Sequence, residues 1–397
     1  MIAAMPATRA AGLDRLARFV PSAGRDYAAG RNHDPGPDDD GAVSRLSAYL
    51  RYRLIDEHEV IAQVLARHSF ASAEKFVAEV LWRTYWKGWL ELRPAVWSRY
   101  RDDCARQRDG LRDEGALIAA ETGQTGIAGF DDWARELMQT GYLHNHARMW
   151  FASIWIFTLR LPWALGADFF LRHLVDADAA SNTLSWRWVA GLQTPGKTYL
   201  ATADNIARYT GGRFAPGGLA REAIALTEPA IPAPRALPDD GALDPGQPAL
   251  LLVTHDDLHP ECVFAERRAF AAALVADDPA LLWGDKAHRF VTAAKTDVLA
   301  RAAARFACPA SGIATLDAQS LIAAAQSAGV RQIATAYAPV GPLADALARL
   351  RPQLASEGIA LGCTRRAWDT HFWPHATKGF FPFKSRIPVG LRDLGVI

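Results

Sequence analysis

The stretch Asp176–Trp188, "DADAASNTLSWRW", places two acids, an amide side chain and two tryptophans within thirteen residues. Asp176 and Asp178 stand where a helix can begin, and Asn182 follows about one turn later. A loop-to-helix junction would turn these side chains toward one cavity. The simpler interpretation is a capped helix whose tryptophans lie in the core. The stretch alone leaves both interpretations open, so the rest of the chain has to decide.

The composition describes a globular chain with room for two cores. It has 397 residues, a net charge of +1 and 50% apolar residues. No apolar run is long enough to cross a membrane, and early arginines interrupt any secretion signal. We expect a cytoplasmic protein without a membrane partner, whose oligomeric state stays open. We also expect no metal site, because the four cysteines are far apart in the sequence. They are Cys104, Cys262, Cys308 and Cys363.

The hydrophobic pattern divides the chain into two domains and a linker. Residues 1–225 carry apolar positions at helical spacing and show no convincing strand. Residues 226–248 form a proline-rich linker without periodicity. Residues 249–397 alternate strand-like and helical segments, which predicts a doubly wound parallel α/β domain. Within it we expect strands near 249–254, 280–283, 331–338 and 358–362, and helices near 262–275, 288–306 and 343–357. No G-x-G-x-x-G follows the first strand, which argues against a nicotinamide-dinucleotide site.

Several separated motifs in the first domain resemble one known family. "VSRLSAYL" occupies residues 43–50, "EVLWR" residues 79–83 and "GYLHNHARM" residues 141–149, and the opening stretch follows them. In this order and at these intervals they resemble the FAD-binding domain of the photolyase/cryptochrome family, from about residue 25 to residue 214. The resemblance implies an all-helical domain that binds FAD in a U shape. A Rossmann-like doubly wound α/β domain that resembles the family's antenna domain follows it.

The resemblance also implies which residues hold the FAD. Ser44, Arg45, Leu46 and Ser47, with Tyr27, correspond to the residues at the diphosphate, where helix N-terminal amides suit an anion. Simple helix capping explains the two serines equally well. Other matched positions surround the flavin: Arg148 and Asp176 as a buried ion pair, Asp178 facing flavin N3, and Asn182 opposite flavin N5. The full implied set is Tyr27, Ser44, Arg45, Leu46, Ser47, Phe76, Glu79, Arg83, Tyr142, Asn145, Arg148, Asp176, Asp178 and Asn182.

Further matches concern electron transfer and the substrate. Trp186 and Trp163 correspond to the first two tryptophans of the family's electron-transfer chain. The third is missing near Gly110, and Trp97, Tyr100 or Trp133 are candidates to replace it. Glu79, Asn182, Trp186 and Trp163 are thus the implied catalytic residues, and an amide at Asn182 favours photolyase chemistry. Trp82, Asn145, Met149 and Trp188 correspond to residues that hold a flipped pyrimidine dimer, for which an aromatic side chain offers stacking.

The chain departs from the family pattern in two places. After Trp188 the usual segment near the lesion cavity is replaced by a different one, with Tyr199 and Phe214 kept in register. The α/β domain follows the helical domain instead of preceding it, which we interpret as a circular permutation. In the family the antenna pigment is methenyltetrahydrofolate or a deazaflavin. A structural α/β module without a pigment is the alternative here.

These features lead to a functional hypothesis. We expect FAD-dependent repair of cyclobutane pyrimidine dimers in damaged DNA, driven by blue light. The alternative is a cryptochrome-like photoreceptor or flavin electron-transfer protein without repair activity; a light-independent flavoenzyme is a third possibility. Six arginines between Arg93 and Arg112 would offer a phosphate-binding loop, although a solvated charged helix fits them nearly as well.

Overall fold

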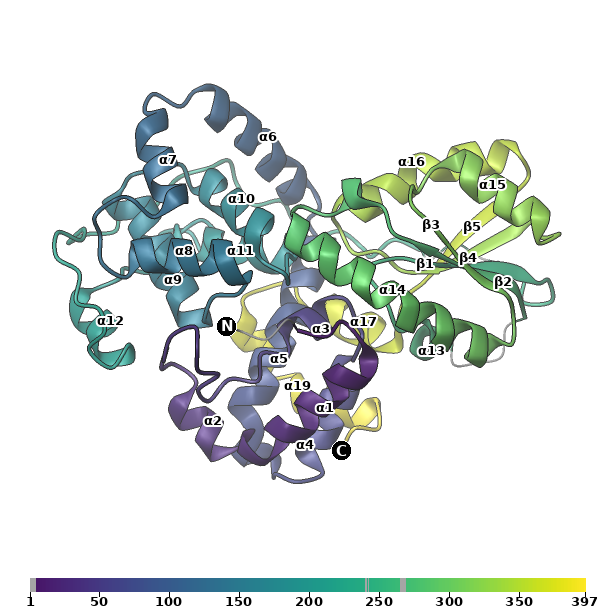
Figure 1. The fold of residues 1–397 in the computed structure, drawn as a ribbon, viewed down its shortest axis with the longest axis horizontal. Helices are drawn as coiled ribbons and strands as arrows, with labels where there is room; N and C mark the ends of the chain where they lie inside the picture. The colour runs from purple at the N-terminus through teal and green to yellow at the C-terminus, as the bar shows by residue number, and fades with distance from the viewer. Residues whose placement is uncertain (1–4, 240, 242, 265–268) are drawn as a thin grey trace.

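A helical body and a sheet domain make up the computed structural model, which describes residues 5–239, 241, 243–264 and 269–397 (Figure 1). No strand occurs among residues 5–239, as the sequence predicts. The helices of the body are α1 (Arg9–Phe19), α2 (Arg25–Gly30), α3 (Ser47–Arg51), α4 (Glu57–Leu65), α5 (Phe70–Glu91), α6 (Ala95–Asp109), α7 (Glu114–Thr122), α8 (Phe130–Thr140), α9 (Asn145–Ser153), α10 (Trp163–His173), α11 (Ala179–Val189) and α12 (Ala203–Tyr209).

Helix α5 is the central element of the helical body. Ser69 caps it by accepting a hydrogen bond from the Ser72 amide, and 22 residues follow without a break. Apolar side chains emerge on nearly every side of its second half, so neighbours surround it. Helices α2, α4 and α11 all pack against it. The side chains that α5 carries are therefore held by packing from several directions.

The second domain is a five-stranded parallel sheet with strand order β3-β2-β1-β4-β5. Leu250 lies opposite both Ala272 and Ile333, and the pairing of β1 with β2 shifts by one residue between Ala249 and Leu250. Helix α14 packs on β2 and β3, whereas α15 and α16 cover the other face (Figure 1). This is the predicted doubly wound α/β fold. Its elements are β1 (Ala249–Val253), α13 (Pro260–Val263), β2 (Phe270–Ala276), α14 (Asp285–Phe306), β3 (Ala310–Ile313), α15 (Ala318–Ser327), β4 (Gln332–Ala336), α16 (Pro342–Ser356) and β5 (Ala360–Thr364).

Two predicted elements of this domain are wrong. The expected helix near 262–275 is instead the short α13 followed by strand β2. Its alanine-rich run "FAAALVA" has no strand-like alternation, and a seven-residue apolar run does not separate helix from strand by periodicity. The expected strand at 280–283 is a 3₁₀ turn over Pro279–Leu281 and an irregular segment. Proline in the first position and an aspartate cap favour that turn.

The core shows how closely the two halves are joined. Leu250 and Leu252 of β1 pack toward α15 and α16, in a core that belongs to the sheet domain alone. Leu251 and Val253, on the other face, belong to a core that continues into the helical body. Alternation along one buried strand therefore links both cores.

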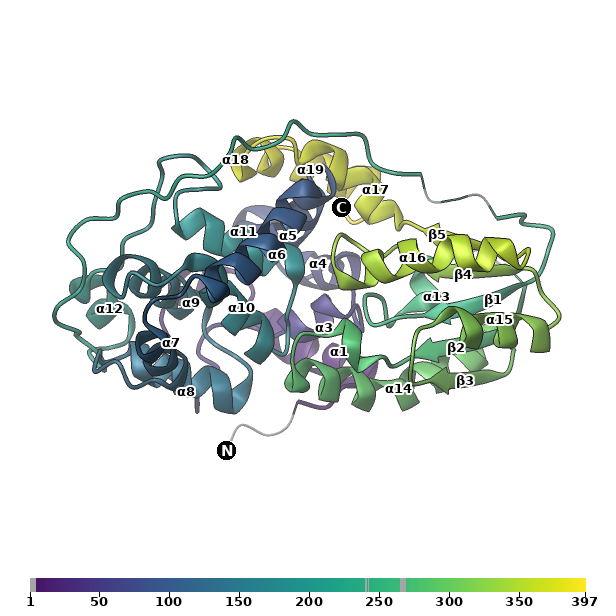
Figure 2. The same ribbon diagram turned by 90° about the horizontal axis from the view of Figure 1, so that it is seen from above.

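The last helices of the chain return to the helical body. They are α17 (Ala367–Phe372), α18 (Phe380–Lys384) and α19 (Ile387–Asp393), and α17 and α18 pack on α5 (Figure 2). Gly88 of α5 allows this contact, because a Cβ there would lie 2.8 Å from the Trp373 ring. The Trp368 indole donates to Thr84 Oγ1 at 3.0 Å. These residues, which the sequence groups with the sheet, thus make their main contacts with α5.

The segment between the two halves crosses the surface of the helical body as an extended chain (Figure 2). The Leu226 amide donates to Ala190 O at 3.0 Å and the Arg235 amide to Leu92 O at 2.9 Å. Residues 240 and 242 of the predicted linker lie outside the described residues. None of the described helices combines the length and apolarity that a bilayer crossing demands.

Candidate functional site

Three polar side chains follow one another along α5 at four-residue intervals. Glu79, Arg83 and Lys87 share one face of the helix because residues four apart lie one above the other. Glu79 Oε1 lies 3.8 Å from Arg31 Nε, and burial raises the Glu79 pKa. Arg83 and Lys87 point toward the entrance of α11 and its acids. One face of α5 thus carries an acid and two cations toward one region.

Asp176 joins α3, α5, α9 and the loop before α11. Arg148 Nη2 lies 3.3 Å from its Oδ1, and Arg83 Nη2 lies 3.4 Å from its Oδ2. The Ser47 hydroxyl also hydrogen-bonds to this carboxylate. Burial alone would raise the Asp176 pKa, but Arg148 and Arg83 outweigh it, so the pKa is lowered. The predicted pair of Arg148 and Asp176 is present, with Arg83 as a second cation.

Asp178 caps α11 and collects three cations. One carboxylate oxygen accepts from the Ser181 amide at 2.8 Å. The other lies 3.1 Å from Arg83 Nη1, 3.5 Å from Lys87 Nζ and 3.5 Å from Arg51 Nε. Burial opposes the charge, yet these cations hold the Asp178 pKa well below its usual range. A buried carboxylate with this support remains ionised and acts only as an acceptor.

The charged cluster continues to the sheet domain. Arg51 Nη1 pairs with Asp256, which follows β1. Burial lowers the Lys87 pKa to about 8, partly offset by Asp178, so this amine is still mostly protonated at neutral pH. Four cations therefore face three carboxylates and leave a net positive charge, which stabilises an anionic ligand. The cations are Arg51, Arg83, Lys87 and Arg148, and the carboxylates are Asp176, Asp178 and Asp256.

The loop before α3 presents groups suited to a diphosphate. Arg45 adopts a left-handed backbone conformation with φ 49°, and its guanidinium lies 4.6 Å from the centre of the Tyr142 ring. The Ser44 hydroxyl accepts from the Leu46 amide at 3.4 Å, and Ser47 begins α3. The donors here are one guanidinium, two hydroxyls and helix N-terminal amides. This donor chemistry, beside a net positive cluster, fits the predicted FAD.

Phe76 lies about one turn before Glu79 on α5, and it contacts Tyr27 of α2. Their ring centres are 5.2 Å apart at 89°, an edge-to-face contact. Phe19 contacts both rings, at 5.9 Å and 4.9 Å. Burial strongly raises the Tyr27 pKa, so its hydroxyl remains a neutral donor. Packing fixes both residues, whereas the predicted phosphate contact of Tyr27 stays a prediction.

Asn182 is held from one side by α10. Its Nδ2 donates to the Ala167 carbonyl at 2.8 Å, and the side chain is buried. That bond leaves the amide oxygen to accept a hydrogen bond from another donor. Trp186, one turn later, contacts Phe170 with ring centres 5.1 Å apart. It also lies against Gly166, where a Cβ would meet the indole at 2.4 Å.

An aromatic series leads from Trp163 to the sheet domain. Trp163 and Tyr100 have ring centres 5.7 Å apart, Tyr100 and Trp97 5.4 Å, and Trp97 and Trp283 5.3 Å. Trp283 precedes α14 and is partly exposed. Trp133 lies elsewhere, stacked on Trp150 at 5.3 Å. Of the three predicted substitutes, Tyr100 contacts Trp163 and Trp97 contacts Tyr100, whereas Trp133 lies outside this series.

The residues predicted to hold a lesion lie on α5, α9 and α11, and α11 packs on both other helices. Asn145 is exposed at the start of α9, and Met149 and Trp188 are partly exposed. Trp188 stacks on Tyr199 at 5.7 Å. Trp82 stacks on Phe380 of α18 at 3.6 Å and 12°. Phe380 is buried, whereas Trp82 is partly exposed.

The arginines between Arg93 and Arg112 mostly bind within the chain. Arg93 donates to the Thr377 carbonyl at 2.7 Å, and Arg99 to the Pro229 carbonyl at 2.8 Å. Arg101 pairs with Asp345 and Arg108 with Asp168, at 3.3 Å and 3.1 Å. These contacts tie the linker, α10 and α16 to α6. Internal pairing therefore explains this segment better than a phosphate-binding loop.

A small crevice lies where the charged cluster meets the sheet domain. Asp178, Lys87 and Asp256 line it, together with Trp283 and residues 339–342 after β4. It sits at the carboxyl ends of β1 and β4, the switch point where α/β folds bind ligands. Its volume is about 20 Å³, room for roughly one water molecule. The crevice as it stands does not admit a pterin or deazaflavin ring.

Sequence reasoning missed Arg51 and Lys87 as members of the site. Lys87 lies one turn beyond Arg83 on α5, so helical periodicity would have found it. Arg51 follows the "SRLSAYL" motif but pairs with Asp256, about 200 residues later. No local pattern predicts that second contact.

Part of the chain is similar to known proteins. Residues 76–210 match the FAD binding domain of DNA photolyase. A deoxyribodipyrimidine photo-lyase of Streptomyces griseus is 36% identical over 188 residues, which cover 45% of this chain and 40% of that protein. One from Agrobacterium fabrum is 34% identical over 182 residues, covering 45% and 37%. A solved bacterial class III photolyase from Agrobacterium tumefaciens is 29% identical, with a TM-score of 0.45, and covers 51% of this chain and 43% of that one.

These matches span less than half the length of the two curated relatives. They fall on the helical body, where the ion pairs of Asp176 and Asp178 lie. The domain that they identify binds FAD. Through residues 76–210 of its helical body, this chain is similar to the FAD binding domain of DNA photolyase.

Proposed function

We propose that the protein is a light-driven DNA lyase that splits cyclobutane pyrimidine dimers. The observation that carries this proposal is the double clamp of Arg83 and Arg148 on Asp176, at the entrance of the helix that bears Asn182. Lesion-side residues stand on the same helices: Glu79 precedes Arg83 by one turn, and Met149 adjoins Arg148. Flavin and dimer would therefore bind side by side.

Each residue then has a role in holding the cofactor. Arg45, with Ser44, Ser47 and neighbouring amides, would bind the diphosphate. Asp178 would accept a hydrogen bond from flavin N3–H, and Asn182 would face N5 through its amide oxygen. The positive cluster around Asp176 and Asp178 would favour an anionic reduced flavin. FAD held by these residues in its reduced form would supply light-driven one-electron chemistry to the dimer.

Other residues would position the dimer and keep the flavin reduced. The outward part of Trp82, with Met149 and Trp188, offers apolar surface to a flipped base pair, and Glu79 and Asn145 offer hydrogen bonds to its edges. Burial raises the Glu79 pKa, while Arg31 opposes the shift. Trp186 and Trp163 would pass electrons inward through the aromatic series that ends at Trp283.

A matched pair of variants tests the role of Glu79. Glu79→Gln should lower the repair rate and alter its pH profile, with the flavin spectrum retained. Glu74 lies on the same helix, five residues earlier, and pairs with Lys384 at 2.9 Å. Glu74→Gln should therefore leave repair unchanged. Equal loss in both variants, or in neither, would remove Glu79 from the mechanism.

A photoreceptor without a DNA substrate is the second candidate. The observation that favours it is the segment after Trp188: residues 191–202 form turns and an irregular stretch before α12, where the rim of the lesion cavity would lie. A gel shift on dimer-bearing and intact duplexes at two salt concentrations separates the candidates. A repair enzyme prefers the damaged duplex at both, whereas a photoreceptor shows no preference.

We further propose that the two domains are circularly permuted relative to the family order. The first and last helices that the structure describes support this proposal, because α1 and the residues after α19 both contact α4. Arg9 pairs with Glu59, and His58 Nε2 lies 3.3 Å from the Leu394 carbonyl. A short connection between the termini would restore the other order.

A further inference from the structure

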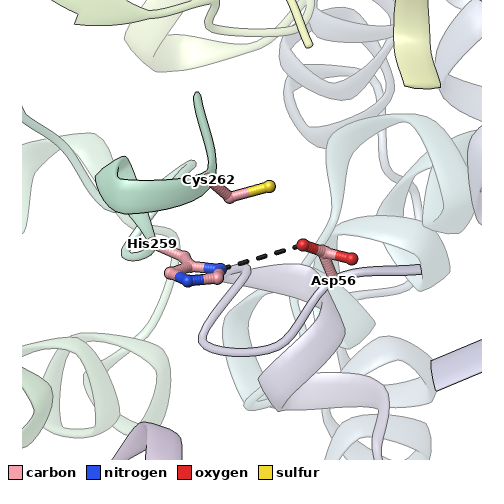
Figure 3. Close-up of side chains that lie close together, drawn as sticks. All are labelled: Asp56, His259 and Cys262. Atoms are coloured by element: carbon pink, nitrogen blue, oxygen red, sulfur yellow. Dashed lines mark ion pairs between the residues drawn. The ribbon is translucent and has the colours of Figure 1, made fainter. Parts of the chain in front are cut away.

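Three side chains from the two halves of the molecule meet beside the loop after β1 (Figure 3). Asp56 precedes α4 of the helical body, whereas His259 and Cys262 belong to the start of α13 in the sheet domain. One ligand atom of each, a carboxylate oxygen, a ring nitrogen and the thiol sulfur, lies within 4.8 Å of the other two. Figure 3 shows the imidazole and the carboxylate facing each other, with the thiol directed toward the same space.

Contacts outside the trio hold the backbone around His259 and the Asp56 side chain in place. Asp56 Oδ1 accepts from the Glu59 amide at 2.9 Å, which fixes the carboxylate and leaves Oδ2 toward His259. The His259 amide donates to Asp257 Oδ1 at 3.0 Å. The Leu258 amide donates to the Tyr52 carbonyl at 2.9 Å, across the domain boundary. The site is therefore largely preorganised before any ligand binds.

The protein leaves one buried polar atom of this trio unsatisfied. His259 is 9% exposed, and its buried Nδ1 has no hydrogen-bond partner among the described residues. Asp56 Oδ2 lies 3.8 Å from that nitrogen, too far for a hydrogen bond. Such an orphaned buried group normally has a partner outside the chain, such as a water molecule or an ion.

Neighbouring cations do not fill this role. Arg9 is paired with Glu59, and Arg366 with Glu57 and Asp369. Among the described residues, His259 is the only basic group within ion-pair distance of the buried Asp56 carboxylate. A buried carboxylate beside a neutral imidazole and a thiol leaves a place for positive charge.

We propose that Asp56, His259 and Cys262 bind one divalent transition-metal ion, for which zinc is the best chemical match, and that this ion fastens the helical body to the sheet domain. Zinc prefers this mixture of imidazole nitrogen, thiolate sulfur and carboxylate oxygen, at about 2.0–2.3 Å. Atoms within 4.8 Å of one another reach that geometry by side-chain rotation, which the exposed Cys262 permits. Water completes the tetrahedron, and the Cys262 thiol releases its proton to solvent.

The spacing explains why the sequence predicts no metal site. No two cysteines are close in the sequence. His259 and Cys262, as His-x-x-Cys, supply only two of the ligands that a zinc site needs. The third ligand, Asp56, comes from the other domain, about 200 residues earlier. Only the docking of the two halves brings it near.

Zinc binding by the intact flavoprotein tests this proposal. We expect a single zinc ion per chain, and with Co²⁺ a thiolate-to-cobalt charge-transfer band. Asp56→Asn keeps a good helix cap, so it should fold. Its zinc affinity should fall at least 10- to 100-fold, because the loss of an outer-sphere partner alone costs roughly that much. Cys262→Ser should abolish the charge-transfer band. Zinc should raise the unfolding temperature of the parent and not of Asp56→Asn.

Two matched variants serve as controls. Asp113→Asn changes another aspartate cap, on α7, and Cys104→Ser another cysteine, on α6; both should bind zinc like the parent. The proposal is overturned if the parent fails to bind zinc at a slight molar excess. It is equally overturned if Asp56→Asn and Cys262→Ser retain the parent's affinity and cobalt spectrum. None of these readouts depends on repair activity, so this result stands apart from the proposed function.

Discussion

Asp178 is the carboxylate on which cations from α3 and α5 converge. Its neighbours show how much of the site can be predicted from the sequence. Asp176, Asp178 and Arg148 are predicted to lie together by their resemblance to a known motif, and the ion pair of Asp176 and Arg148 is present. Lys87 could have been found from helical spacing, although no motif marks it. The pairing of Arg51 with Asp256 was not predictable, because it depends on how two separate domains dock.

Replacing Asp178 by asparagine should destabilise the fold strongly. The new amide would still cap α11, but Arg83, Lys87 and Arg51 would lose a buried countercharge. We expect the free energy of unfolding to fall by about 3–5 kcal/mol in chemical denaturation. Asp345→Asn, which breaks the exposed pair with Arg101, should cost less than about 1 kcal/mol. Similar losses in both variants would contradict the buried network.

At the same scale, the aromatic series predicts how the flavin is photoreduced. Trp97→Phe should slow photoreduction by about tenfold or more, because it removes an easily oxidised indole between Tyr100 and Trp283. Trp133→Phe should leave the rate unchanged, since Trp133 stacks on Trp150 away from the series. The rate is measured as flavin bleaching under blue light with an external thiol. A route through Trp133 would reverse this order.

Helix α5 connects both halves, and its end illustrates the element scale. Glu91 accepts hydrogen bonds from Tyr337 Oη at 2.9 Å and from the Val340 amide after β4. Helix α5 itself was predicted, as were β1, β4 and β5, because their periodicity or length was distinctive. Strand β2 was not, because its short alanine-rich run becomes a strand only between β1 and β3. Tertiary pairing there overrides local preference.

Glu91 predicts a pH dependence of stability. Burial raises its pKa to about 7, although its hydrogen bonds oppose the shift. Between about pH 4.5 and 7 the folded state keeps a proton that the unfolded state has released, so stability falls as pH rises through this window and then levels off. The loss is on the order of 3 kcal/mol. Glu91→Gln should remove this component, as seen in urea denaturation across the window.

A surface substitution provides the comparison for Glu91. Glu357→Gln, at the exposed end of α16, should keep the parent's slope of stability against pH. Other titrating groups affect parent and variants alike, so the difference between them isolates Glu91. Identical slopes in the parent and in Glu91→Gln would mean that Glu91 titrates normally.

At the scale of the whole molecule, the two halves share one core and several buried ion pairs. Arg53, for example, pairs with Asp257 at 3.1 Å and with Asp369 at 2.9 Å. A helical half and an α/β half are predictable from the sequence pattern. The return of α17 and α18 to α5 is not, because amphipathic segments do not specify which domain they will cover. The helical body is thus completed by residues from the end of the chain.

The proposed permutation predicts that the domain order can be exchanged. A variant that begins at residue 249, continues to 397, and connects through a flexible Gly/Ser linker to residues 5–239 should fold and bind FAD. Arg9 and Leu394 both contact α4, so the new connection spans a short surface path. Its flavin spectrum and unfolding temperature should resemble those of the parent. Failure to bind flavin, with the parent competent, would contradict the permutation.

Light-dependent repair by the purified flavoprotein is the most direct measurement of the central claim. An oligonucleotide with a single cyclobutane dimer is incubated with the photoreduced protein under blue light or in darkness, and remaining dimers are counted by chromatography. We predict loss of dimers in the illuminated sample alone, with many dimers split per protein molecule. Persistence of the dimers under illumination, while the flavin is bound and reduced, would contradict the assignment as a DNA lyase.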